Sequence, residues 1–222
     1  ASSDLTNIPL VRRCAGHRLP LLLSSGMGTV AEIERALAVA GDMGCDEIAV
    51  LHCISLYPTP PDKSELRAIP ALKERFGIPV GFSDHSLSPA LPVAAVALGA
   101  RIIEKHFTLD RSLPGPDHAV ALEPDQFKLM ADGCRDVAAA LGSGKKLITE
   151  ELDEVRNGSL RGLYAAADIP AGTELTVEMV ALLRPAAKLT AGDLPSVLGR
   201  IATQSLKEGD PISPESLREK GK

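Results

Sequence analysis

The feature that most constrains the fold is an alternation of short apolar runs with longer amphipathic stretches over residues 1–142. Four apolar runs, each of strand length, lie roughly 20–30 residues apart. They cover residues 20–24, 47–51, 79–82 and 101–104. Runs that are apolar throughout are typical of strands buried on both faces, as in parallel sheets. The spacing is that of consecutive strand–helix units, and it predicts an α/β fold with a parallel sheet.

Helical patterns fill the intervals between these runs. Thr29 is expected to cap a helix that extends to about Gly41, and Ser64 to begin the next helix. An alanine-rich stretch over residues 88–98 and a longer amphipathic pattern over residues 124–141 predict two more helices. Four strand–helix units make only half of an eight-stranded barrel, which leaves two strand edges and an apolar inner face open. We therefore expect either a partner chain or further residues of a longer protein to close the barrel.

Polar residues follow each predicted strand, at the end where parallel barrels carry their active sites. They include Ser24, Ser55, Tyr57, Ser83, Asp84, His85 and His106. Imidazoles on neighbouring strand ends suit Mn²⁺, Fe²⁺ or Zn²⁺, so His85 and His106 are the candidate metal ligands. A structural hydrogen-bonding role is the alternative for each. Ser2, Ser24 and Ser83 would present hydroxyls that can bind a phosphate or a carboxylate.

Other polar residues leave two interpretations open. Asp4 is a candidate oxygen ligand or a group that orients metal-bound water. Asp84 could support an imidazole or cap the following helix, and Asp117 could bind a sugar hydroxyl or cap a turn. We expect His52 to be buried with its hydrogen bonds satisfied and His118 to be exposed to solvent.

The pattern changes after residue 142. Residues 143–158 are mostly polar and predict a linker or a solvated connecting helix. Residues 159–222 form a second predicted domain with an internal echo, since 169–179 and 206–216 share the same order of apolar, Gly, Thr or Ser, and Glu positions. Gly172 and Gly209 fall at predicted tight turns of this compact pseudo-symmetric domain.

Composition excludes several functions. Only 3% of residues are aromatic, there is no Trp, and the formal net charge is −5, so nucleic-acid binding is not expected. No stretch reaches the roughly 20 apolar residues of a membrane span. The four cysteines form no short-spaced pair, which favours reduced thiols and a cytoplasmic protein.

Five short motifs, in this order, resemble those of sialic acid synthases. They are Leu-Ser-Ser-Gly-Met at 23–27, Leu-His-Cys-Ile-Ser-Leu-Tyr-Pro-Thr-Pro at 51–60, Gly-Phe-Ser-Asp-His at 81–85, Glu-Lys-His-Phe-Thr at 104–108 and Pro-Gly-Pro-Asp at 114–117. Residues 159–222, with Leu-Arg-Pro at 183–185, resemble the antifreeze-like (SAF) domain of the same family. The resemblance implies the C-terminal half of a (β/α)8 TIM barrel followed by a small β-clip SAF domain.

The resemblance also implies a reaction, in which phosphoenolpyruvate condenses with N-acetylmannosamine or a related amino sugar and phosphate is released. It implies Mn²⁺ at His85 and His106, and a catalytic carboxylate at Asp4, where the family often has Glu. Two sets of contacts follow from it. Ser2, Ser24 and Ser83 match contacts to phosphoenolpyruvate, Tyr57 and Asp117 match sugar contacts, and Ser55 stands at a substrate-binding position.

Arg184 matches an arginine that one subunit sends into the partner's site, which implies a domain-swapped homodimer. Two departures bear on the resemblance, because some members of the family carry Asn at the position of Ser55 and the usual Gly after Arg-Pro is Ala186 in this chain. A non-catalytic sugar-binding or assembly module is the alternative function. A metal-dependent aldolase is a further one, which the motifs at 81–85 and 104–108 disfavour.

Overall fold

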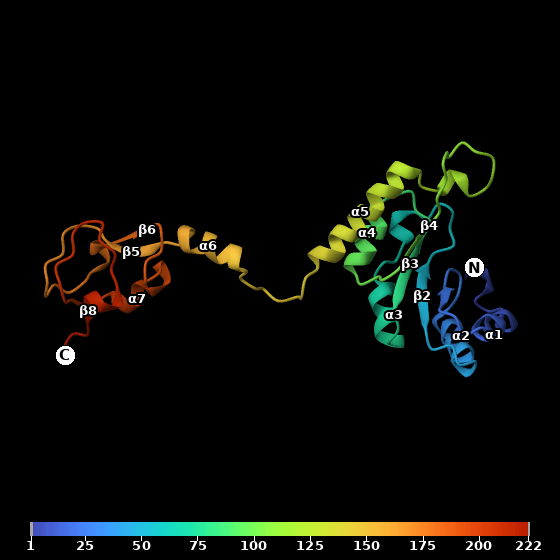
Figure 1. The fold of residues 1–222 in the computed structure, drawn as a ribbon, viewed down its shortest axis with the longest axis horizontal. Helices are drawn as coiled ribbons and strands as arrows, with labels where there is room; N and C mark the ends of the chain where they lie inside the picture. Colours follow the sequence, from blue (N-terminus) through green and yellow to red (C-terminus); the bar gives the residue numbers. More distant parts are fainter. Residues whose placement is uncertain (1, 222) are drawn as a thin grey trace. The chain divides into compact units, whose positions relative to one another are not determined.

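The computed structural model describes residues 2–221, which divide after Gly144 into two compact units. The first unit is built on a sheet of four parallel strands in the order β1-β2-β3-β4 (Figure 1). The strands are β1 (Leu21–Ser24), β2 (Ile48–Cys53), β3 (Val80–Asp84) and β4 (Ile103–Lys105). This arrangement confirms the parallel α/β sheet expected from the apolar runs.

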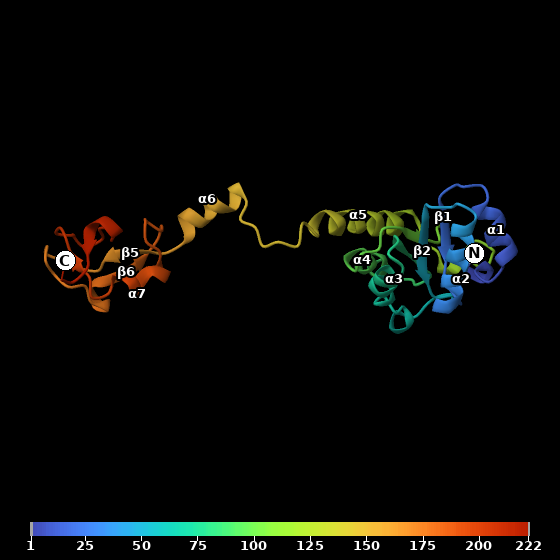
Figure 2. The ribbon, with the colours of Figure 1, turned by 90° about the horizontal axis from the view of Figure 1, so that it is seen from below.

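Five helices connect and flank the strands. They are α1 (Ile8–Ala15), α2 (Val30–Asp42), α3 (Ala68–Phe76), α4 (Ala90–Ala97) and α5 (Pro124–Ala140). Helix α1 packs on α2, and α4 packs on α5, as both views show (Figures 1 and 2). The apolar core of the unit lies between helices and sheet, where Ile33, Ile69, Val50 and Phe82 are all buried.

The helix boundaries follow local chemistry. Thr29 caps α2 as predicted, since its hydroxyl accepts a hydrogen bond from the Glu32 amide while the Glu32 carboxylate accepts one from the Thr29 amide. The prediction that Ser64 begins a helix is wrong. Pro61–Lys63 forms a short 3-10 helix that ends at Ser64, and Glu65 has a positive φ of 46°, so the α-helix cannot start until after this turn.

The second unit begins with an exposed helix, α6 (Glu150–Ser159), which matches the solvated connecting helix considered for this stretch. Short elements follow: β5 (Gly162–Ala165), β6 (Val180–Leu183), α7 (Leu194–Val197), β7 (Ile201–Ala202) and β8 (Leu217–Arg218). Strands β5 and β6 pair antiparallel, as do β7 and β8. Leu163, Leu175 and Ile212 are buried in a core of this unit's own.

The internal echo is visible in the backbone of the second unit. Ile169 and Leu206, at equivalent positions of the two copies, exchange two backbone hydrogen bonds of 2.8 Å. Gly172 and Gly209 both have a φ of 84°, a conformation that only glycine adopts without strain. The two copies therefore form the pseudo-symmetric pair that the sequence predicts.

Two further observations concern the described residues as a whole. Within them, no helix combines the length and the apolar character needed to cross a membrane. The four cysteines are all unpaired, with Cys45 and Cys53 buried.

Candidate active site

A cavity of about 420 Å³ opens at the carboxyl ends of the four parallel strands. Its lining is dominated by hydroxyl, imidazole and carboxylate groups. The lining residues are Ser2, Ser3, Leu22, Ser24, Met27, Leu51, Cys53, Ser55, Tyr57, Ser83, His85, Glu104 and His106. The cavity thus brings together seven of the predicted site residues that lie in the first unit, and Ser2 is the only one of these placed before β1.

Strand geometry explains which side chains reach the cavity. Successive side chains of a strand point to opposite faces, so Ser83 and His85 share one face, as do Glu104 and His106 on the neighbouring strand. Ser83 pairs with Glu104 in the β3–β4 register, and its hydroxyl donates a 2.7 Å hydrogen bond to the Glu104 carboxylate. The two histidines follow in the same alternation, and their ring centroids lie 5.1 Å apart.

The orientation of His85 is fixed by the strand beside it. Its Nδ1 lies 3.0 Å from the carbonyl oxygen of Ile54. Because a carbonyl can only accept, Nδ1 carries the hydrogen, and the neutral ring keeps its lone pair on Nε2. Burial opposes protonation of His85, but hydrogen bonds to Cys53 and Ile54 outweigh it and raise its pKa.

His106 and Tyr57 complete an aromatic group at this end of the cavity. The Tyr57 ring lies 4.2 Å from the His85 ring and 5.8 Å from the His106 ring, measured between centroids. Burial, reinforced by the charge of His85, lowers the pKa of His106. Burial likewise raises the pKa of Tyr57, with the negative charges of Cys53 and Asp117 acting in the same direction. At neutral pH, His106 is therefore an uncharged imidazole and Tyr57 a hydrogen-bonding phenol.

The serine hydroxyls form a polar wall. Ser2 Oγ and Ser55 Oγ lie 2.9 Å apart, and Ser24 and Ser83 line the same cavity. Gly26 makes the Ser2–Ser55 contact possible, since a Cβ at this position would lie 2.2 Å from Ser2 Cβ and 2.3 Å from Ser55 Oγ. Hydroxyl donors grouped in this way suit a phosphate or carboxylate ligand.

Three predicted site residues are not among those lining the cavity. Asp4 sits in the 3-10 helix Ser2–Asp4, where its carboxylate accepts a 3.2 Å hydrogen bond from Asn7, and it borders a neighbouring apolar hollow. Asp117 is exposed in the loop after β4, close enough for its charge to influence Tyr57 and His106. Arg184 is an exposed residue of the second unit.

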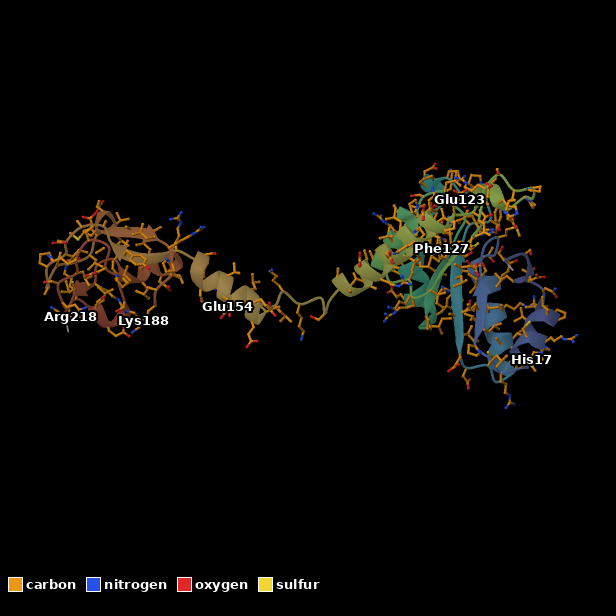
Figure 3. The ribbon with its side chains drawn as sticks, turned by 45° about the horizontal axis from the view of Figure 1, so that its top comes forward. His17, Glu123, Phe127, Glu154, Lys188 and Arg218 are labelled. Carbon is orange, nitrogen blue, oxygen red and sulfur yellow. The ribbon has the colours of Figure 1, made fainter. Side chains whose placement is uncertain are left out.

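The loop that carries Asp117 is anchored at the start of α5. Phe107 packs edge-on against Phe127 with ring centroids 5.4 Å apart, and the Glu123 carboxylate accepts a 3.0 Å hydrogen bond from the Arg111 amide. Glu123 and Phe127 are labelled in Figure 3. These contacts at both ends of the loop restrict where Asp117 can lie.

The histidines outside the cavity have structural roles. His52 is buried, with Nε2 2.9 Å from the Ser64 carbonyl, which confirms the interpretation of a satisfied core histidine. The expectation that His118 is solvent-exposed is wrong. It is half-buried, and its Nδ1 lies 2.7 Å from the Thr108 hydroxyl, because the loop folds back on itself at Gly115.

Among the described residues, the Asp84 side chain neither hydrogen-bonds to an imidazole nor caps α4. Its carboxylate pairs with Lys105 at 2.7 Å and accepts a 2.9 Å hydrogen bond from the amide of Ser86, well before α4 begins. The side chain points away from the imidazoles because it alternates with Ser83 and His85 along the strand.

Two ionisable cavity residues were missed at the level of sequence. Glu104 stands two positions before His106 and Cys53 two positions before Ser55, so the alternation of a strand would have found both. Burial opposes ionisation of Cys53, yet hydrogen bonds with His85, Ser24 and Ser83 outweigh it and lower the pKa of the thiol.

The donor set partly fits the metal that the resemblance implies. His85 offers the lone pair of Nε2, and its other nitrogen is held by a backbone carbonyl, as is usual for metal-bound imidazoles. Across residues 2–221, no group of three or more His, Cys, Asp or Glu side chains is placed to hold an ion. A metal held by these two histidines would therefore need further ligands from solvent, a substrate or other parts of the protein.

Comparison with known proteins agrees with the motifs. The model of the NeuB family matches residues 1–146, and that of the SAF domain matches residues 161–218. An uncharacterized protein of Methanocaldococcus jannaschii is 42% identical over 212 residues, covering 96% of this chain and 63% of that protein. An N,N'-diacetyllegionaminic acid synthase of Legionella pneumophila is 34% identical, covering 94% of this chain and 60% of that enzyme.

Solved structures show the same relationship. The spore coat polysaccharide biosynthesis protein spsE of Bacillus subtilis is 33% identical with a TM-score of 0.61, over 99% of this chain and 66% of that one. The N-acetylneuraminic acid synthetase of Leptospira borgpetersenii is 36% identical with a TM-score of 0.65, over 69% of this chain and 54% of that one. The chain thus spans less than two thirds of the length of these relatives. It belongs to the NeuB family of sialic acid synthases and carries a SAF domain.

Proposed function

We propose that this chain is part of a nonulosonic acid synthase, which joins phosphoenolpyruvate to an open-chain N-acyl amino sugar such as N-acetylmannosamine. In this reaction C3 of phosphoenolpyruvate bonds to the sugar aldehyde carbon, water adds at C2, and phosphate leaves with its bridging oxygen. The observation that carries the proposal is the cavity at the strand ends, which gathers two imidazoles, a row of serine hydroxyls and a tyrosine. Relatives named legionaminic, pseudaminic and N-acetylneuraminate-9-phosphate synthases support it.

The cavity residues divide between the two substrates. Hydroxyls of Ser2, Ser24 and Ser83 would donate hydrogen bonds to the phosphate and carboxylate of phosphoenolpyruvate. Tyr57 and Ser55 would bind the sugar. Asp117 would reach the sugar from its anchored loop. Each of these groups acts by fixing the reacting carbons next to each other, which lowers the entropic part of the barrier.

His85 and His106 would hold a divalent cation, with Mn²⁺ as our choice and Asp4 as the residue that orients water beside it. When bound, such an ion would polarise the aldehyde oxygen and lower the pKa of a bound water molecule. His85 contributes through its hydrogen bond to the Ile54 carbonyl, which places the hydrogen of the neutral ring on Nδ1 and leaves the lone pair of Nε2 aimed in one direction.

We propose further that the four-stranded sheet is half of an eight-stranded barrel, which other residues of a longer protein complete. Within residues 2–221, β1 and β4 each have one edge that pairs with no further strand of the sheet, and Leu22 of β1 is half exposed. The family resemblance also implies a homodimer in which Arg184 serves the partner's cavity. Mixing inactive His85→Ala and Arg184→Ala proteins should then restore turnover in mixed dimers.

The test is an assay of the protein purified from its source, after its intact mass has been measured. With phosphoenolpyruvate, Mn²⁺ and N-acetylmannosamine, we expect a mass above 23.3 kDa together with phosphate release. The 222-residue chain alone should be inactive. His85→Ala and His106→Ala should abolish turnover, whereas the exposed His17, labelled in Figure 3, serves as the matched control and should tolerate Ala.

A mass of 23.3 kDa without turnover would favour the alternative, a non-catalytic sugar-binding or assembly module. The partial coverage of the relatives favours this alternative for the chain on its own, because the chain then lacks the remaining half of the proposed barrel.

A further inference from the structure

A buried ion pair lies directly behind the two histidines. Lys105 Nζ is 2.7 Å from Asp84 Oδ2, and the two side chains are 0% and 1% exposed. Ser86 surrounds the pair with hydrogen bonds, since its amide and hydroxyl donate to the two Asp84 oxygens at 2.9 and 3.0 Å, and its carbonyl accepts from Lys105 Nζ. Both charges are therefore fully enclosed and satisfied within the protein.

The pair stands at the position where register decides which side chains face the cavity. Asp84 and Lys105 are Cα partners in the parallel pairing of β3 with β4, directly before His85 and His106. A slip of one residue would turn every side chain of one strand to the opposite face. On the cavity side, the Ser83–Glu104 hydrogen bond joins the preceding pair of partners. Side-chain contacts on both faces of the sheet therefore stabilise the observed register of β3 and β4.

The energetics of burial favour a role in specificity. Removing two charges from water is costly, so a buried ion pair is weak evidence for a gain in stability, and apolar residues of similar size often serve stability as well. What an ion pair supplies, and an apolar pair lacks, is a penalty for every arrangement that separates the charges. This penalty falls on alternative registers of β3 and β4.

We propose that Asp84 and Lys105 are positioning residues that hold the imidazoles of His85 and His106 together at the cavity. The use made of the two histidines rests on the proposed function, but their mutual placement can be tested without it. The ion pair acts through the backbone, because each member directly precedes one of the histidines.

The first test is NMR spectroscopy of the 222-residue chain without added metal. In the wild-type protein, NOEs should connect the rings of His85 and His106, and long-range ¹⁵N spectra should show the hydrogen of His85 on Nδ1. Lys105→Met leaves Asp84 without its partner, so this variant could unfold. The double variant Asp84→Asn/Lys105→Met leaves no unpaired charge buried. It should fold, with these NOEs weakened or lost. The core variant Leu72→Ala is the destabilised control and should keep them.

The second test is Mn²⁺ binding by calorimetry with the same proteins. Substitution of groups that orient metal ligands typically weakens binding by about 10- to 100-fold, and we expect this loss in the double variant but not in Leu72→Ala. A double variant with wild-type NOEs and the wild-type His85 tautomer would overturn the positioning role. If the wild-type chain binds no Mn²⁺ but shows the NOEs, the two histidines do not hold the ion without ligands from other parts of the protein, and the positioning role stands.

Discussion

Gly26 controls how closely two cavity hydroxyls approach each other. Its position leaves no room for a Cβ between Ser2 and Ser55. Gly26→Ala should therefore push Ser2 and Ser55 apart and break the hydrogen bond between them. The substitution should destabilise the first unit by about 1–3 kcal/mol, the usual cost of overpacking. Urea unfolding followed by circular dichroism would measure this change.

Gly41 provides the control for this substitution, because it lies in α2 and no other group stands within 4 Å of the place that a methyl side chain would occupy. Gly41→Ala should be neutral or stabilise the unit by up to about 1 kcal/mol, since alanine favours helix. Equal unfolding midpoints for wild type and Gly26→Ala would show that Ser2 can move aside at no cost.

His52 should make the stability of the first unit depend on pH. Burial lowers the pKa of this side chain in the folded protein. Below the ordinary histidine pKa of about 6.5, the unfolded chain takes up a proton at His52 that the folded chain does not, so stability falls as the pH falls. His52→Gln should reduce the loss of stability between about pH 7.5 and about pH 5.5.

Hydrogen exchange of the β2 amides, measured by mass spectrometry at both pH values, would follow this effect in wild type and variant. The loss of protection in the variant has to be compared with the loss in wild type, because carboxylates and the other histidines titrate in both proteins. An identical loss of protection in His52→Gln and wild type would contradict the expectation.

At the residue scale, the sequence shows which side chains share a face more readily than it shows their partners. The alternation of strands predicts Ser83 and His85 at the cavity, and it would also have found Glu104. The partner of Asp84 is a lysine on another strand, 21 residues away, and a local pattern carries no information about such a pairing. His118 was misjudged for the same reason, since its partner Thr108 is brought close only by the folded loop.

At the element scale, the capping box of α2 offers a direct test of a local signal. Thr29→Ala removes the hydroxyl that accepts from the Glu32 amide, and it should destabilise the first unit by about 1 kcal/mol. Thr29→Ser keeps an equivalent hydroxyl and should stay close to wild type. Thermal unfolding together with amide exchange in the first turn of α2 would detect the difference; equal protection in the two variants would mean that packing alone fixes this helix end.

Most elements of the first unit could be predicted because their signals are local. Apolar runs of strand length give β1 to β3 within one or two residues, and helical periodicity gives α2, α4 and α5. The start of α3 was misplaced, because two prolines and the positive φ of Glu65 delay the helix beyond Ser64. The parallel order of the strands follows from the helical crossovers, whereas their register depends on contacts between strands.

At the scale of the whole molecule, the described residues contain two separate apolar cores. One core draws on residues 5–103 and the other on residues 163–217. Residues 141–159, between them, are exposed throughout. The boundary placed near residue 142 from the loss of apolar periodicity stands close to the division after Gly144, and the sequence echo in the second unit corresponds to paired backbone segments around Ile169 and Leu206.

The second unit should therefore fold without the first. We predict that residues 145–222, expressed alone, give a dispersed amide NMR spectrum and a cooperative thermal transition, because their core and backbone pairing lie within this segment. Leu163→Ala is the informative variant, since Leu163 is fully buried and its truncation should cost about 2–5 kcal/mol, most of the stability of so small a domain. Val177→Ala, at an exposed position, should leave the spectrum intact. A poorly dispersed spectrum for the wild-type segment would mean that the second unit needs the first unit in order to fold.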